Sequence, residues 1–317
     1  MHRVRTLCLV LALVAGAAIA PAAEARDAPP SRFTVHAGDQ REGGDVLAAF
    51  VMPGRTLPIR ATGLAAGQAA VLQTGGRGRI TGVPGSRAWR WRAPERPGLY
   101  PLVVHAEGGT AEVRLNVFVK TPVDHARRTL DGFRIGRYEP QPQAGRPDTA
   151  PPAGLIRVTP ANRDTRLSPH FRLDQFLCHQ QPEHWPKYVL VQPRLLDKLE
   201  RLHGALAEAG FPLDTITVMS GYRTPWYNAD IGNTTRYSRH LFGGAADIYV
   251  DADGDDRMDD LNGDGTVDTR DAAWLADLVE TVNAAHPELI GGLSAYPANA
   301  HHGPFVHIDA RGYRARW

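Results

Sequence analysis

The sequence predicts two folded domains, an all-β domain followed by an α+β domain, behind an export signal. Apolar residues alternate with polar ones in short runs before residue 120, whereas they recur at helical spacing after residue 190. Between these regions, residues 121–165 are rich in proline, arginine and glutamine. A chain of 317 residues, 43% of them hydrophobic, is long enough for two domains and is typical of a folded protein.

Residues 1–25 have the layout of a secretory signal. Arg3 and Arg5 precede an apolar run at residues 7–20, and residues 23–25 have the A-x-A form of a cleavage site. A membrane anchor is the alternative, but the run is shorter than the roughly 20 residues that span a bilayer. We therefore expect a periplasmic or secreted protein with no membrane span after cleavage.

The composition limits the classes of partner. The formal net charge is +2 at pH 7 and no block of lysine and arginine stands out, so nucleic acid is not an expected partner. Cleavage would leave Cys178 as the one cysteine, so the mature chain could form no internal disulfide. Cys178 lies between apolar residues, which indicates a buried structural thiol rather than a nucleophile. We expect a monomer stabilised by packing or bound metal.

Residues 30–120 predict the all-β domain. Every second residue of the run 112–119 is apolar, so one face of this strand is formed by Val113, Leu115, Val117 and Val119. Trp89 and Trp91 alternate with arginines in the same way, and residues 107–110 suit a hairpin turn. Short strands separated by glycine and proline clusters predict an immunoglobulin-like sandwich.

Residues 121–165 predict an extended linker. They include the run YEPQPQAGRPDTAPPAG, whose residues bury little apolar surface. Such a segment does not gain enough from burial to offset the entropy lost on ordering.

The α+β domain is expected over residues 166–317. A helix is predicted at residues 192–210, where Pro193 suits the first turn and Gly210 the end, with a stripe formed by Leu195, Leu199, Leu202 and Leu206. Further elements are a helix at residues 270–285 and strands at residues 214–223, 245–250 and 304–311. These elements do not repeat as βαβ units, so an antiparallel sheet is favoured.

His240 and Asp247 are the first candidates for a metal site. Gly243 and Gly244 lie between them, so the chain can bend there and bring both side chains to one point. A catalytic zinc takes three ligands of such types and keeps one position for water.

His307 is the best third ligand. In a strand it shares a side with Asp309, whereas Val306 and Ile308 face the core. Asp309 would then accept a hydrogen bond from an imidazole. Two less well placed alternatives lie in a loop rich in glycine, proline and asparagine, His301 and His302.

The motifs around these residues resemble a known family. The pattern S-x-H-x-x-G-x-A-x-D is matched by Ser238, His240, Gly243, Ala245 and Asp247, and residues 220–223 read S-G-Y-R. With the late F-V-H-I-D strand, these motifs resemble peptidase family M15, the zinc D-alanyl-D-alanine carboxypeptidases and murein endopeptidases. The resemblance covers roughly residues 165–317. It implies a hedgehog/DD-peptidase-like fold with one catalytic zinc held by His240, Asp247 and His307.

The resemblance also implies a peptidase that acts on peptidoglycan stem peptides or their cross-links. Arg223 is expected to bind a substrate carboxylate or the developing oxyanion, with a structural ion pair as the alternative. The candidate substrate-binding residues are Ser220, Tyr222, Ser238 and Tyr296, although buried packing explains the two tyrosines as well. The competing function is a peptidoglycan-binding protein that keeps the metal without turnover.

The sequence departs from the family pattern at one place. Many members carry an acidic residue or a histidine two or three residues before the second metal histidine, where this chain has Phe305 and Pro304. The endopeptidase-like branch also lacks that group, which favours an endopeptidase over a D,D-carboxypeptidase. Proton transfer could come from Asp309, His301 or His302.

Residues 251–271 form an acidic insertion that resembles the calcium loop of EF-hand and dockerin modules. Gly265 allows the sharp turn, and carboxylates supply the oxygen ligands that calcium prefers. The candidate ligands are Asp260, Asn262, Asp264, Thr266, Asp268 and Asp271. An upstream run repeats the spacing in part, so we expect one or two calcium ions. A solvated acidic loop is the alternative.

Overall fold

The computed structural model describes residues 33–317, except residues 39, 43, 83–84, 110 and 213–214. The export signal expected at residues 1–25 lies outside the described residues. None of the described helices combines the length and the apolar composition needed to cross a membrane.

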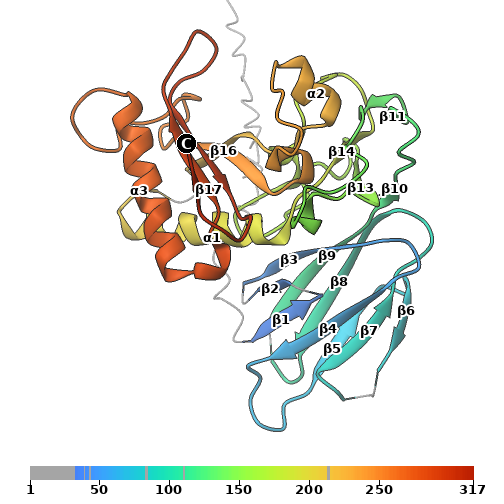
Figure 1. Ribbon diagram of the computed structural model, residues 1–317. Helices are drawn as coiled ribbons and strands as arrows, with labels where there is room; N and C mark the ends of the chain where they lie inside the picture. The colour runs from blue at the N-terminus through green and yellow to red at the C-terminus, as the bar shows by residue number, and fades with distance from the viewer. Residues whose placement is uncertain (1–32, 39, 43, 83–84, 110, 213–214) are drawn as a thin grey trace, which may run out of the picture.

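Residues 34–119 form two β-sheets that enclose a common core, and we call them the β region (Figure 1). One sheet has the order β2-β1-β4-β7-β6, with the bounds Gln40–Glu42, Thr34–Ala37, Thr56–Thr62, Ala88–Arg92 and Arg79–Thr81. The other has the order β3-β9-β8-β5, with the bounds Val46–Val51, Glu112–Val119, Gly98–Ala106 and Ala70–Gln73. Paired strands are antiparallel except β3 and β9, which are parallel.

The alternation expected in the β region is present. Val113, Leu115 and Val117 are fully buried in the core between the sheets, and Trp91 is buried there as well. β8 and β9 form the hairpin expected around residues 107–110. Burial of these apolar faces, worth about 25 cal/mol per Å², is the main force that holds the two sheets together.

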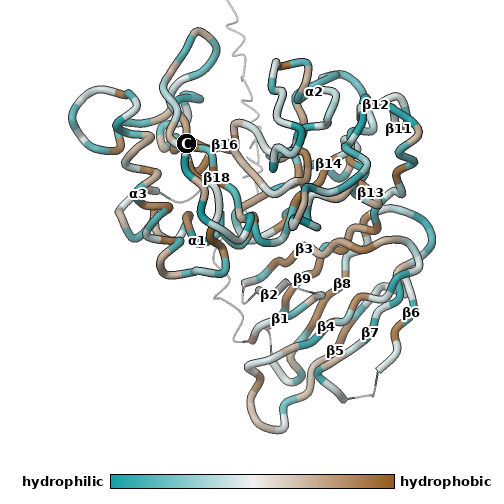
Figure 2. Tube along the Cα trace, in the orientation of Figure 1, coloured by the Kyte–Doolittle hydropathy of each residue, from teal (hydrophilic) through white to brown (hydrophobic). Residues whose placement is uncertain are grey.

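The outer face of β3 and β9 is also buried, against residues 166–317. Ala48 and Phe118 belong to the core formed mainly by the later residues. Ala48 N donates to the Leu167 carbonyl at 2.8 Å, and Asn116 Nδ2 donates to the Arg166 carbonyl at 2.8 Å. Figure 2 shows β3 and β9 as largely apolar strands beside the later residues. Because both of their faces are covered, β3 and the end of β9 do not alternate.

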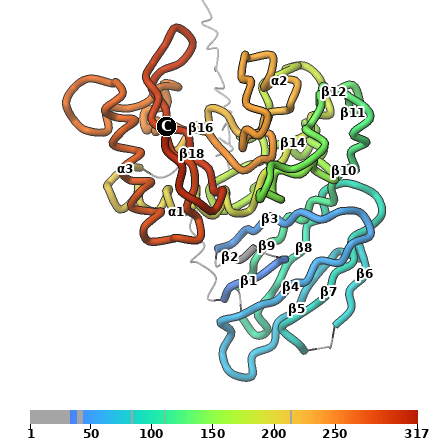
Figure 3. The backbone as a smooth tube through the Cα atoms, in the orientation of Figure 1, coloured from blue at the N-terminus to red at the C-terminus, as the bar shows by residue number. Residues whose placement is uncertain are grey.

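Residues 121–165 are folded, so the prediction of an extended linker is wrong. Their elements are β10 (Thr121–Pro122), β11 (Thr129–Leu130), β12 (Phe133–Arg134), η1 (Pro147–Thr149) and β13 (Gly154–Val158). β11 and β12 form a hairpin, and β13 pairs with both β10 and β14 (Lys187–Val189). Figure 3 shows this green segment beside β14 and α2.

A few apolar residues explain why this segment folds. Phe133, Ile135 and Tyr138 are buried in the larger core, together with residues of α1 and β16. Leu155, Ile156 and Val158 of β13 are buried in the same core. The neighbouring elements supply most of that core, so these six side chains order a segment that is otherwise rich in proline and glutamine.

Residues 166–317 combine helices with a mostly antiparallel sheet, as predicted. The sheet has the order β15-β16-β18-β17-β19, with the bounds Ile216–Ser220, Ala245–Val250, Phe305–Asp309, Gly292–Tyr296 and Ala315–Arg316. β17 and β19 are parallel, and the other pairs are antiparallel. The helices are η2 (Leu173–Phe176), α1 (Pro193–Glu208), α2 (Pro225–Asp230), η3 (Arg239–Phe242), α3 (Thr269–Ala285) and η4 (Pro287–Leu289).

The helix α1 follows its sequence signals closely. It begins at Pro193, and Gly210 lies just beyond its end with φ 93°. The predicted leucine stripe is buried, and α1 packs against α3, which in turn covers β17 and β18. Lys198 on the same helix is also fully buried, beneath the end of β18.

Candidate metal centre

Three side chains from separate parts of the sequence meet on one face of the sheet. Asp247 on β16 lies opposite His307 on β18 in the antiparallel register, and His240 comes from η3 just before β16. His240 Nε2 lies 3.2 Å from His307 Nδ1 and 3.2 Å from Asp247 Oδ1, and His307 Nδ1 lies 2.9 Å from Asp247 Oδ1. All three residues are buried. Two imidazoles and a carboxylate therefore direct one atom each at a shared space.

The spacing of these three atoms suits a zinc ion. Tetrahedral zinc with bonds of about 2.0–2.2 Å keeps two of its ligand atoms about 3.3 Å apart. The edges of the triangle measure 2.9–3.2 Å, so shifts of a few tenths of an ångström would complete the geometry. Two imidazole nitrogens and one carboxylate oxygen also form a donor set of the type that catalytic zinc sites use. The residues present fit the metal that the sequence motifs imply.

The turn between His240 and Asp247 depends on glycine. Gly243 ends η3 in the left-handed region, with φ 66°, which favours glycine. A Cβ atom there would lie 2.5 Å from the carbonyl carbon of Leu190. The predicted bend at the glycines is present, and it delivers the chain into β16 directly after the histidine.

The other nitrogen of each imidazole is held by a hydrogen bond. His240 Nδ1 lies 2.7 Å from the Gly221 carbonyl, so Nδ1 carries the proton and the Nε2 lone pair faces the triangle. His307 Nε2 lies 3.5 Å from Asp309 Oδ2, which leaves Nδ1 to face the triangle. Such partners fix the tautomer and the orientation of a metal-binding histidine.

Arg223 pairs with the carboxylate of the triangle. Its guanidinium donates to Asp247 Oδ2, and its Nε donates to Ser220 Oγ at 2.9 Å. Asp247 therefore directs one oxygen at the histidines and the other at Arg223. Of the two roles expected for Arg223, the structure contains the ion pair.

The electrostatics of the site follow from burial and from these pairings. Burial lowers the pKa of His240. Burial would also lower the pKa of His307, but hydrogen bonds with Asp247 and Asp309 raise it. Although burial alone would raise the pKa of Asp247, His240 and His307 hold it well below its usual range. Asp247 is therefore an anion at neutral pH, as a metal ligand must be.

The candidate substrate-binding residues lie in different environments. Tyr222 does not line the site, because it is 1% exposed and its hydroxyl lies 2.7 Å from that of Tyr138. Ser238 precedes η3 and is buried. Ser220 accepts the hydrogen bond from Arg223, so it supports the site from the neighbouring strand. Tyr296 is partly exposed at the end of β17.

The candidate groups for proton transfer, Asp309 and His302, differ in their exposure to solvent. Asp309 is fully buried and accepts from Gly292 N and from Arg311. Although burial alone would raise the pKa of Asp309, hydrogen bonds with His307 and Arg311 hold it below its usual range. Asp309 is therefore a poor proton acceptor and serves to orient His307. His302 is partly exposed, and its ring lies edge-on to that of Phe305 at 4.9 Å.

An aromatic wall, formed by Tyr296, Phe305 and Trp317, borders the site. The rings of Tyr296 and Phe305 stack with centroids 4.7 Å apart, and Trp317 Nε1 donates to the Tyr296 hydroxyl at 2.6 Å. The Trp317 ring lies 5.2 Å from that of His307 and the residue is 57% exposed. The sequence analysis assigned no substrate-binding role to Phe305 or Trp317. Phe305 could have been found, because it lies two residues before His307 on the same strand, whereas Trp317 has no local signal.

The acidic insertion is held together by its own hydrogen bonds. Asp260 accepts from the backbone N–H groups of residues 263–265, and Asp251 accepts from those of residues 254–256. Asp264 pairs with Arg270 at 2.7 Å.

Asp271 is fully buried and accepts three backbone N–H groups, so it caps the start of α3. The carboxylates that lie close enough to share a cation are those of Asp251, Asp253 and Asp259.

A second group of histidine and carboxylate side chains lies apart from the triangle. His170 Nδ1 lies 2.6 Å from Glu200 Oε2, and the His170 ring stacks on His203 with centroids 3.6 Å apart. Glu200 and His203 belong to α1. Although burial alone would raise the pKa of Glu200, its hydrogen bonds with His170 and Ser168 lower it. This group connects α1 to the turn that contacts β3.

Comparison with known protein families finds a match to the part of the chain that contains His240 and Asp247. Residues 169–261 match the family model described as Peptidase M15. The matched segment runs from the turn before η2 to the middle of the acidic insertion, and it contains His240, Asp247 and Arg223. No curated protein matches the chain. The match indicates a peptidase of the metal-dependent type.

Proposed function

We propose that this chain is an exported zinc peptidase that hydrolyses peptidoglycan stem peptides or their cross-links, with an endopeptidase favoured over a D,D-carboxypeptidase. The observation that carries the proposal is the triangle of ligand atoms from His240, Asp247 and His307, with edges of 2.9–3.2 Å. The match of residues 169–261 to Peptidase M15 supports the reaction class.

In this proposal His240, Asp247 and His307 would hold zinc, which would polarise the scissile carbonyl and lower the pKa of a water molecule to about 7. The chain's own groups keep the ligands in place. The Gly221 carbonyl and the Asp309 carboxylate hold the outer nitrogens of the two imidazoles, so both inward nitrogens keep their lone pairs. Buried surroundings strengthen these interactions, because little water competes for them.

Arg223 has two tasks in the proposal. It holds the second oxygen of Asp247 and is itself oriented by Ser220. Its side chain keeps 13% of its surface exposed, so its free edge can donate to a substrate oxygen next to the metal.

We assign proton transfer to His302. It is partly exposed and packs against Phe305, whose side chain shares a strand face with His307. His302 Nδ1 donates to the Gly303 carbonyl at 2.8 Å and Nε2 accepts from Asn299 Nδ2 at 2.7 Å, so Nε2 is the basic nitrogen and takes up a proton when it exchanges its contact with Asn299 for one with the substrate or water. Asp309, which is fully buried, is assigned the orientation of His307 instead.

The competing function, a binding protein that keeps the metal without turnover, has one observation in its favour. Positions 304 and 305, before His307, are proline and phenylalanine, so no carboxylate extends from them to the triangle.

The β region, in this proposal, is an immunoglobulin-like domain that acts as a spacer or contacts the cell wall. Its core is built from two facing sheets. The protein would work as a monomer in the periplasm or outside the cell, where the apolar run at residues 7–20 would direct it.

The test is incubation of purified sacculi with the protein, with and without a chelator, followed by chromatography of the released fragments. The peptidase releases chelator-sensitive products, and the matched His240→Ala variant releases none. Loss of a cross-link identifies an endopeptidase, and loss of a terminal residue a carboxypeptidase. Binding to sacculi without any chelator-sensitive product would support the binding protein instead.

A further inference from the structure

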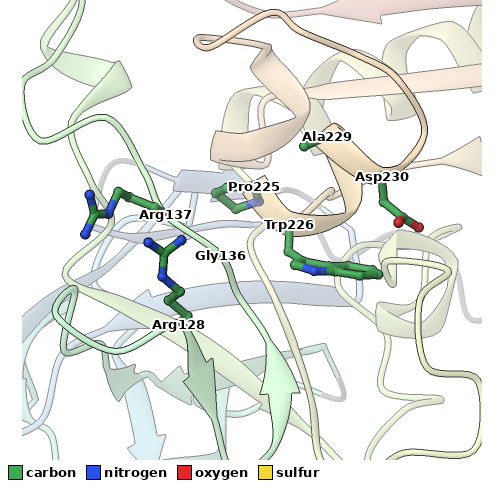
Figure 4. A pocket seen from close by; sticks show the side chains of 7 residues that line it. All are labelled: Arg128, Gly136, Arg137, Pro225, Trp226, Ala229 and Asp230. Carbon is green, nitrogen blue, oxygen red and sulfur yellow. The ribbon is translucent and has the colours of Figure 1, made fainter.

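A cleft lies between residues 128–137 and the helix α2. It has a volume of about 470 Å³, within the range of ligand sites, and is lined by Arg128, Gly136, Arg137, Pro225, Trp226, Ala229 and Asp230. Figure 4 shows the two arginines on one side of the cleft and Trp226 and Asp230 on the other. None of these residues forms the metal-facing triangle.

The walls of the cleft are fixed by close backbone contacts. Trp226 N donates to the Ile135 carbonyl at 3.1 Å. Gly136 has φ 83°, and a Cβ atom there would lie 2.4 Å from Trp226 N, so glycine is required for this approach. The Arg134 guanidinium lies 4.4 Å from the centroid of the Trp226 ring, which holds the indole from one face. The cleft is therefore preformed.

The charges in the cleft favour an anion at the arginine wall, because the two guanidinium groups outnumber the one carboxylate, that of Asp230 on the opposite side. Within the described part of the chain, neither Arg128 nor Arg137 pairs with a carboxylate, in contrast to Arg223, which does so beside the metal-facing triangle. Two unneutralised guanidinium groups on one wall repel each other, and a bound carboxylate removes that repulsion through charge-assisted hydrogen bonds. The indole opposite offers an apolar surface for the residue that carries the carboxylate.

The cleft is within reach of a peptide held at the triangle. Trp226 follows Arg223 by three residues, so their Cα atoms are at most about 11 Å apart. An extended peptide covers that distance with three or four residues. A substrate whose scissile bond lies at the triangle can therefore place a residue three or four positions away in the cleft.

We propose that this cleft is a subsite for an acidic peptide, in which Arg128 and Arg137 bind a carboxylate of the substrate and Trp226 packs against the residue that carries it. The inference rests on the proposed function for the identity of the peptide. It adds a specificity for free carboxylates over carboxamides.

The test measures equilibrium binding of two fluorescently labelled probes to the full chain: a peptidoglycan stem tetrapeptide, and the same peptide with every carboxylate converted to a carboxamide. The double variant Arg128→Gln/Arg137→Gln should weaken binding of the acidic probe by roughly tenfold to a hundredfold, because hydrogen bonds between charged groups are lost. It should leave the weaker binding of the amidated probe unchanged. The matched control is Arg77→Gln/Arg201→Gln, which removes the same charge from exposed positions elsewhere.

The result that overturns the proposal is equal loss of binding in the two double variants, or no loss in either. Failure of the proposed function is recognised separately with sacculi, which contain the cross-links: the wild-type chain would then bind the acidic probe but release no chelator-sensitive product from sacculi. Circular dichroism of each variant establishes that it is folded.

Discussion

His240 Nε2 and His307 Nδ1 lie 3.2 Å apart, although the two residues are separated by 67 positions in the sequence. Both atoms also lie close to Asp247 Oδ1. Three acceptor-type atoms at this distance repel one another unless a proton or a cation lies among them. A bound metal satisfies all three at once.

Replacement of His240 by alanine should remove zinc, because two ligands bind the ion far more weakly than three. Metal analysis of the purified protein should find about one zinc per wild-type chain and almost none in His240→Ala. Asp264→Ala is the matched control, because Asp264 lies in the acidic insertion and pairs with Arg270. Equal zinc contents in the two variants would contradict the site.

Replacement of Arg223 by glutamine should weaken zinc binding roughly tenfold to a hundredfold, since groups that orient a metal ligand contribute effects of this size. The physical reason is that Asp247 Oδ2 loses its guanidinium partner. Competition with a chelator of known affinity measures the change. Ser220→Ala removes only the 2.9 Å hydrogen bond to Arg223 and should have a smaller effect. If Arg223 served the substrate alone, neither variant would change zinc affinity.

Replacement of Asp309 by asparagine should separate orientation from proton transfer. Asp309 is buried, holds His307 Nε2 and pairs with Arg311, so the variant should lose roughly 3 kcal/mol of unfolding free energy and some zinc affinity. Chemical denaturation and the chelator competition measure the two effects. A variant that keeps full zinc affinity and stability but loses kcat would show instead that Asp309 transfers the proton.

Lys198 should make stability depend on pH in the alkaline range. It is fully buried, and its Nζ donates to the Asp309 carbonyl at 2.9 Å. Burial lowers its pKa to about 8, against 10.5 for an unburied lysine. Between these two values the unfolded chain binds more protons than the folded chain, so the unfolding free energy should rise with pH by up to about 3 kcal/mol. Below pH 8 the full cost of burying the cation is present.

Denaturation of the wild type and of Lys198→Met at pH 7 and pH 10 checks this expectation. The wild type should gain stability relative to the variant between the two pH values, because the variant has no titrating group at this position. Parallel changes in the two proteins would mean that the burial of Lys198 does not control its ionisation.

Calcium binding by residues 251–271 remains a prediction from the loop pattern. Calcium should raise the melting temperature, because the ion would relieve the repulsion among the crowded carboxylates. Scanning calorimetry with and without a calcium-specific chelator measures the shift, and Asp264→Ala should lose calcium but keep zinc. An unchanged melting temperature on chelation would support a loop that its own hydrogen bonds and Arg270 hold together.

Local sequence determined much of this protein. Pro193, the leucine stripe and Gly210 define α1, and the apolar alternation of residues 112–119 defines β9, because each signal acts within one element. The bend at Gly243 follows in the same way, since a left-handed residue in close contact with Leu190 must be glycine. His240 and Asp247 share one short motif, so their meeting is largely a local matter.

Only the tertiary structure decided the rest. The average composition of residues 121–165 predicts an extended linker. The segment folds because side chains such as Phe133 and Tyr138 pack into an apolar core to which elements distant in the sequence contribute. The ion pair of Arg223 with Asp247 depends on the register of β15 and β16, which places Ser220 opposite Asp247. The burial of Tyr222 depends in the same way on its contact with Tyr138. These outcomes depend on pairing and burial between segments far apart in the chain, and no pattern within one segment records them.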